Sequence, residues 1–165
     1  MSLSYDAAQW SNFFIAEVGA SAALVGLLFV AVSINLDRII ELPSLPGRAF
    51  EALSVLVMVL LVASFALVPG QSKAVLGTEI LLAALGCWAT TVFIQHEAPR
   101  HVSEPRIWMI SRVTATQIAT LPMIVGGGSL LAGHGGGLHW TVVGVVASFL
   151  AALIDAWVLL VEIKR

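Results

Sequence analysis

Residues 13–38 have the sequence FFIAEVGASAALVGLLFVAVSINLDR. From Phe13 to Leu36 nearly every side chain is apolar or small, and at about 1.5 Å per helical residue the stretch is about 36 Å long. That length is enough to cross a hydrocarbon core of roughly 30 Å. We therefore predict that this stretch is the first transmembrane helix.

The predicted helix has two faces with different side chains. One face carries small residues at alternating spacings of three and four: Ala16, Gly19, Ala23, Gly26, Val30 and Ser33. The opposite face has polar ends and an apolar middle: Glu17, Ser21, Leu24, Leu28, Ala31 and Asn35. Small residues let two helix backbones approach closely inside a membrane. With two such specialised faces, we expect the helix to be buried in protein.

The composition of the whole chain is that of a membrane protein. Hydrophobic residues make up 59% of it and charged residues 11%, against about a quarter in soluble domains, and the mean hydropathy is +0.97. The basic residues form no run, which argues against a nucleic-acid-binding surface. The N-terminal residues lack the basic segment of a secretory signal, so we expect the first span to remain in the mature protein.

The pattern of apolar stretches predicts an all-α, polytopic transmembrane bundle that forms one domain over residues 1–165. Its five spans cover about residues 13–36, 50–68, 74–95, 107–131 and 138–163. The second is the most uniformly apolar, and we expect it to be the most exposed to lipid. The fourth contains Arg112, Pro122 and the triplet Gly126, Gly127 and Gly128. We expect this span to be surrounded by protein and kinked or unwound near Pro122.

Basic residues between the spans predict the orientation. If the N-terminus lies outside, every Arg and Lys except Lys73 falls on the cytoplasmic side. We therefore predict a multi-pass protein of a bacterial inner or plasma membrane, with its N-terminus outside and its C-terminus in the cytoplasm. Its surroundings are the lipid bilayer.

Two carboxylates lie at one depth near the predicted outer boundary. Glu17, Glu79 and the triplet Gly126, Gly127 and Gly128 are each about 9 Å inside it. Carboxylates together with free backbone carbonyls could hold an inorganic cation. The alternative is that each glutamate is satisfied separately by hydroxyls, by water or by extending towards Lys73.

A second polar layer lies near the opposite boundary. Arg112 and Asp155 are at similar depths on consecutive spans joined by a short linker, so we predict that they form a structural ion pair. For Glu51, early in the second span, we expect a pair with Arg48 or Arg38.

The sequence offers little support for an enzyme, and we expect no cofactor. All histidines fall in loops, whereas axial haem ligands would be expected within spans. Ser129 follows glycines but has no histidine within a span to activate it. A surface metal site at His134 and His139 is a weaker alternative to a flexible glycine-rich loop, so we predict no metal site.

The stretch GASAALVGLLFVAVSINLDRI at residues 19–39, the LPGR at residues 45–48 and the terminal AWVLLVEIKR resemble a family of small polytopic bacterial integral membrane proteins. Members of that family are mostly uncharacterised, and some are labelled as modulators of a membrane protease. Residues 21–37 are also weakly similar to the pore helix of calcium-release-activated calcium channels. That similarity implies layers at Glu17, Leu24, Leu28 and Arg38.

These features lead to two hypotheses about function. The first is a homo-oligomeric protein that conducts or binds cations, in which the face with Leu24, Leu28 and Asn35 borders the pathway and Glu17 and Glu79 form the outer site. The alternative is a non-conducting accessory or regulatory subunit that docks on a larger membrane complex through its small-residue faces.

Overall fold

Five long helices dominate the computed structural model, which describes residues 6–42, 45–97 and 106–163. The elements are η2 Ala7–Trp10, α1 Ser11–Ile34, α2 Leu36–Glu41, α3 Leu45–Ala66, α4 Lys73–Glu97, α5 Arg106–Ala132 and α6 His139–Ile163. All except η2 and α2 are long and apolar enough to cross a membrane. For the described residues, the predicted all-α class is therefore confirmed, as are five helices long and apolar enough to span a membrane.

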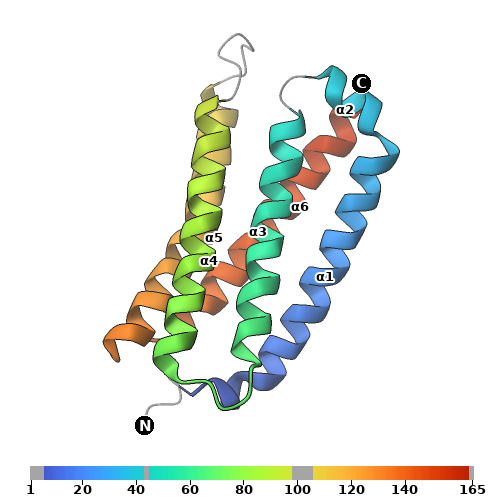
Figure 1. Cartoon of the computed structure of the whole chain (residues 1–165). Coiled ribbons are helices and arrows are strands. Elements are labelled where there is room, and N and C mark those ends of the chain that lie inside the picture. The colour runs from blue at the N-terminus through green and yellow to red at the C-terminus, as the bar shows by residue number, and fades with distance from the viewer. Residues whose placement is uncertain (1–5, 43–44, 98–105, 164–165) are drawn as a thin grey trace.

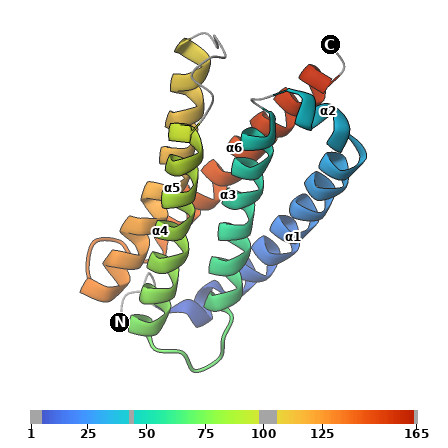
Figure 2. The same cartoon turned by 45° about the horizontal axis from the view of Figure 1, so that its top comes forward.

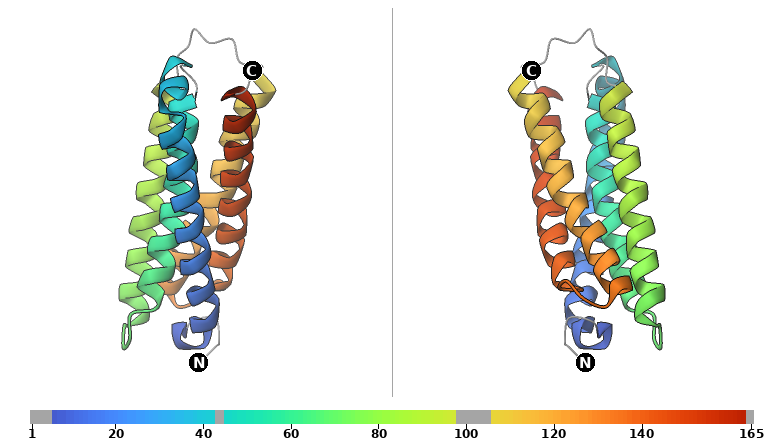
Figure 3. Two further views of the ribbon diagram at one scale, coloured as in Figure 1. Left: turned by 90° about the vertical axis from the view of Figure 1, so that its right-hand side faces the viewer. Right: turned by 90° about the vertical axis from the view of Figure 1, so that its left-hand side faces the viewer.

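Consecutive long helices run in opposite directions. The two termini lie at opposite ends of the bundle (Figure 3), as an odd number of crossings requires. Below, the end that carries α2 is called the α2 end, and the end that carries the turn between α3 and α4 is called the Gly70 end. At that turn Gly70 has a φ of 72°, a left-handed conformation that glycine adopts without a steric penalty.

Helix α3 lies at the centre of the bundle. It contacts α1, α4 and α6, and Figures 1 and 2 show it between α4 and α1. Its interior side combines alanines with valines, and it also buries Arg48 and Glu51. The prediction that this span is the most exposed to lipid is therefore wrong. Lipid tails and a protein interior are equally apolar, so apolar character alone does not distinguish them.

Helix α1 lies at the edge of the bundle. It packs mainly on α3, and its buried residues are Phe14, Ser21 and Leu28. Gly19 and Gly26 are exposed, with open space where a side chain would be. Within one chain, the expectation that α1 is buried in protein is wrong. The face that begins with Glu17 turns towards the bundle, and the small-residue face turns away from it.

Two local expectations also change. The LPGR stretch is not a turn between spans, because α3 already begins at Leu45, with Pro46 in the first helical turn where its missing N–H costs little. Arg48 thereby lies one turn before Glu51. Helix α5 is continuous from Arg106 to Ala132 with Pro122 inside it, so no unwound segment separates its two halves.

Candidate functional site

The predicted outer cation site is not assembled within one chain. Glu17 is on α1 and Glu79 is on α4, and α3 lies between these helices (Figure 1). Glu17 is half-buried, and its Oε2 atom is buried without a hydrogen-bond partner in the described part of the chain. Glu79 accepts a hydrogen bond from the side-chain amide of Gln71, just before α4. Each carboxylate therefore has a separate environment.

The glycine triplet lies within continuous helix α5, and Gly127 serves helix packing. A Cβ atom on Gly127 would lie 2.9 Å from the carbonyl oxygen of Gly77 and 2.9 Å from the backbone nitrogen of Leu81, both on α4. Helices α4 and α5 cross closely here because both carry glycine. Glu79 lies two positions from both Gly77 and Leu81, so the helical period directs it to the other side of α4.

The predicted pathway face of α1 lines a groove. Leu24, Leu28 and Asn35 all contribute to an apolar groove between α1 and α6. The Asn35 amide donates to the Ala31 carbonyl oxygen at 2.8 Å, which satisfies one of its donors within the helix. The groove lining is nearly all hydrocarbon, so it offers an ion few groups to replace its water shell.

The strongest polar interaction is a buried ion pair between α3 and α5. The Arg112 guanidinium binds both carboxylate oxygens of Glu51, with Nη2 to Oε1 at 2.7 Å and Nε to Oε2 at 2.8 Å. The Arg112 side chain is 8% exposed and that of Glu51 is fully buried. This parallel two-bond geometry is the strongest that arginine makes with a carboxylate. The pair ties α3 to α5 near the α2 end.

A second pair joins α3 to α6. The Nη1 atom of Arg48 lies 3.7 Å from Oδ1 of Asp155, and both side chains are largely buried. The predicted pair between Arg112 and Asp155 is therefore replaced by two pairs that both use α3. The prediction paired the two charges because their helices are consecutive in sequence. Since α3 lies at the centre of the bundle, it instead supplies a partner to both Arg112 and Asp155.

Gln95 on α4 completes this polar cluster. Its side-chain amide donates to the Thr116 hydroxyl at 3.0 Å and to Glu51 Oε2 at 3.5 Å. Gln95, Thr116 and the partnership of Glu51 with Arg112 were not predicted. The pair of Glu51 and Arg112 could have been predicted from their positions in the sequence, because both charges lie inside spans. We call Arg48, Glu51, Gln95, Arg112, Thr116 and Asp155 the polar cluster. It connects α3, α4, α5 and α6.

The polar cluster is suited to structure more than to ligand binding. It holds two cationic and two anionic side chains, so its formal charges cancel. Both oxygens of Glu51 accept hydrogen bonds from Arg112, which leaves little capacity for a cation. The polar cluster therefore fixes the relative positions of α3, α4, α5 and α6 at the α2 end.

The loop residues considered for chemistry make local contacts. The Ser129 hydroxyl donates to the His134 carbonyl oxygen and accepts the Gly137 amide at 2.7 Å, so it orders the glycine-rich linker. The His139 ring packs edge-on against Trp10, with 5.0 Å between ring centroids. In the described part of the chain, no group of three or more His, Cys, Asp or Glu residues is placed to hold a metal ion.

Comparison with other proteins identifies no relative. No protein-family model, curated protein or solved structure matches the chain.

Proposed function

We propose that this is a non-conducting accessory membrane protein that docks on another transmembrane helix through the outer face of α1. The partner helix belongs to a second copy or to a larger complex. The protein lies in the cell membrane with its α2 end on the cytoplasmic side, where the basic residues gather.

The observation that carries this proposal is the outer face of α1. An added Cβ atom at Gly19 or Gly26 would meet no atom of the described residues within 4 Å, and Ala16 and Ala23 are exposed beside them. Such faces let two backbones approach and gain van der Waals contact, which drives helix association in lipid. The alternating spacing of three and four residues matches the packing of helices that cross at about 20°.

The remaining charges support association over conduction. The polar cluster neutralises its own charges, and Glu79 is satisfied locally by Gln71. The face of α1 available to another chain is therefore small and apolar. An ion pathway shared between copies on that face would lack polar groups over most of its length.

A matched pair of variants tests the proposal. Leucine at both Gly19 and Gly26 fills the outer face of α1, whereas leucine at Gly86 places one such side chain at an exposed, open position on α4. We expect the α1 variant to lose energy transfer between labelled copies in vesicles, or to lose the proteins that co-purify with the wild type from native membranes. The Gly86→Leu variant keeps them. Full association of the α1 variant would refute the proposal.

A second candidate function is cation conduction by a homo-oligomer, and it is favoured by the buried Glu17 oxygen, which has no hydrogen-bond partner among the described residues. A carboxylate oxygen without a hydrogen bond is a ligand that a cation can use. Ion flux into proteoliposomes separates the candidates. The docking proposal expects flux no faster than in empty vesicles. Flux that is lost in Glu17→Gln but kept in Glu79→Gln would instead establish the second candidate.

A further inference from the structure

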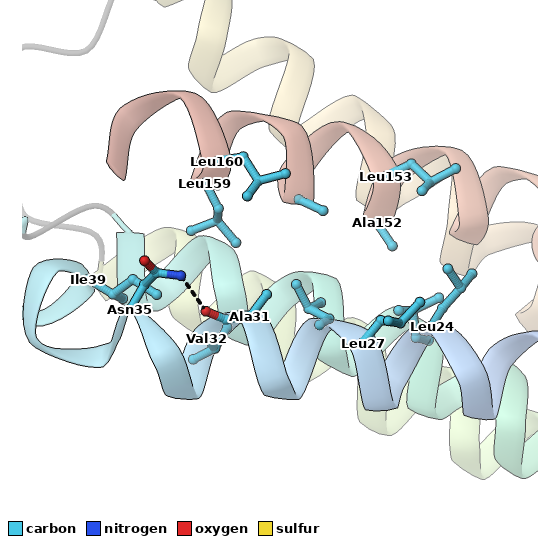
Figure 4. Close-up of a pocket in the computed structure, with 13 residues that line it drawn as sticks. Leu24, Leu27, Ala31, Val32, Asn35, Ile39, Ala152, Leu153, Leu159 and Leu160 are labelled. Atoms are coloured by element: carbon cyan, nitrogen blue, oxygen red, sulfur yellow. Dashed lines mark hydrogen bonds between the residues drawn. The ribbon is translucent and has the colours of Figure 1, made fainter. Parts of the chain in front are cut away.

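The groove between α1 and α6 is open along its side. Leu24 of α1 and Ala152 of α6 lie on its two sides (Figure 4). Leu28 of α1, Leu56 of α3 and Ala156 of α6 also line it. The cavity volume is about 330 Å³. Since both walls are membrane-spanning helices, the groove opens towards the bilayer.

The lining of the groove is chemically uniform. Every contributing side chain is apolar except Asn35, which lies at one end of the groove (Figure 4). Leu27, Leu153 and Leu160 line the groove yet are 68%, 52% and 51% exposed, so they form its rim. This lining favours a hydrocarbon occupant that enters from the membrane.

The width of the groove decides which hydrocarbon fits. From Leu24 to Asn35 the groove runs for about 16 Å along α1. Even the full empty space of about 910 Å³, which includes the open side, averages below about 60 Å² in cross-section over that length. An α-helix about 10–12 Å across needs about 80–110 Å². The groove therefore cannot enclose a helix, and its size suits a single extended chain.

The short helix α2 at the polar end of the groove carries one positive and one negative side chain that form an ion pair, Arg38 and Glu41. Ile39 of α2 lines this end, and Arg38 precedes it in the same short helix. The Arg38 Nη1 atom lies 3.0 Å from Oε2 of Glu41, and both side chains are exposed. An adjacent cation and anion complement a zwitterionic headgroup, whose phosphate and ammonium are likewise neighbours.

We propose that the groove binds one acyl chain of a phosphatidylethanolamine molecule. Its phosphate lies at Arg38 and its ammonium group at Glu41. The hydrocarbon chain passes Asn35 and extends to Leu24, where it closes the gap between α1 and α6. This site uses the inner face of α1, so it is independent of docking through the outer face.

Photo-crosslinking in vesicles tests this proposal. The full chain is reconstituted in phosphatidylethanolamine and phosphatidylglycerol vesicles that contain a small amount of phosphatidylethanolamine with a diazirine midway along one acyl chain. Mass spectrometry of the illuminated protein maps the labelled residues. We expect labels to concentrate on groove residues such as Leu28 and Ala156. Even labelling of all exposed apolar residues, including Leu82 and Phe93, would overturn the proposal.

Two alanine substitutions provide the control. Ala156→Trp fills the groove from α6, whereas Ala89→Trp adds the same bulk to an exposed position on α4. We expect groove labelling to fall in Ala156→Trp to the level of the lipid-facing residues and to be unchanged in Ala89→Trp. Undiminished labelling in a folded Ala156→Trp protein would contradict acyl-chain binding. The wild-type map decides the question even if this variant does not fold.

Labelling by two lipids with different headgroups tests the positions proposed for the phosphate and the ammonium group. The same diazirine chain on phosphatidylglycerol should label the groove less, because its anionic headgroup has no ammonium for Glu41. The Glu41→Gln variant should reduce the difference between the two lipids. Equal labelling of the wild type by both lipids would refute the headgroup assignment.

Discussion

Helices α1 and α3 are almost equal in hydropathy but differ sharply in burial. Only Phe14, Ser21 and Leu28 of α1 are buried, whereas more than half of the residues of α3 are buried. In water, such apolar helices would both be drawn inside a protein. In a bilayer the surrounding lipid is as apolar as the core, so hydropathy places a helix in the membrane without deciding its neighbours.

The difference between the two helices lies in their polar residues. Helix α3 carries Arg48 and Glu51, whose charges require partners away from lipid, and α5 and α6 supply them. In α1 the polar residues bond mostly within the helix, as Ser33 does to the Phe29 carbonyl oxygen at 2.8 Å. Polar partnership thus fixes the position of α3, whereas α1 is free to present a face outward.

The largest predicted effect comes from breaking the buried pair that fixes α3. Arg112→Met leaves the Glu51 carboxylate buried without its cation, and we expect this to lower the free energy of unfolding by about 3–5 kcal/mol. Reversible unfolding in lipid–detergent micelles measures the change.

A double variant shows whether the missing partner is the cause. Glu51→Leu combined with Arg112→Met removes both charges, so most of the lost stability should return. If the double variant is as unstable as the single one, packing at these positions determines stability. Charge pairing would then not explain why α3 lies at the centre of the bundle.

The fold was largely predictable because crossing a membrane imposes a simple requirement. A long apolar stretch is visible in sequence, and all five spans were found from that signal. The start of α3 was missed, since Pro46 and Gly47 indicated a turn although the first helical turn tolerates both. Burial was predicted wrongly for α1 and α3, because apolar content does not distinguish lipid from protein.

The candidate site was predictable only in part. Arg112 and Asp155 were recognised as charges that need partners, but each partner depends on which helices are neighbours. Sequence order suggested the α5–α6 hairpin, and the central position of α3 could not be read from it. The sequence likewise predicted that Glu17 and Glu79 lie at a similar depth in the membrane. It did not predict that α3 lies between the two helices that carry them.

Glycine substitutions sharpen the contrast between a packed helix and an open one. A Cβ atom on Gly127 would meet the α4 backbone at 2.9 Å, so Gly127→Ala should lower the free energy of unfolding by about 1–3 kcal/mol. A Cβ atom added to Gly128 would meet no atom of another described element within 4 Å. Gly128→Ala should leave stability unchanged or raise it by up to about 1 kcal/mol. Thermal unfolding in detergent compares the two, and equal losses would show that the α4–α5 crossing is not the cause.

The smallest predicted effect concerns the ion pair on α2. Arg38 and Glu41 approach to 3.0 Å, close to the 2.7 Å of Arg112 and Glu51, but their side chains are 50% and 64% exposed. Water solvates either group when the other is removed, so Arg38→Gln should change the free energy of unfolding by about 0.5 kcal/mol or less. The measurement is the unfolding experiment used for Arg112→Met, in micelles without phosphatidylethanolamine. A loss as large as that of Arg112→Met would mean that distance, and not burial, sets the strength of ion pairs in this protein. Buried charge would then not explain the central position of α3.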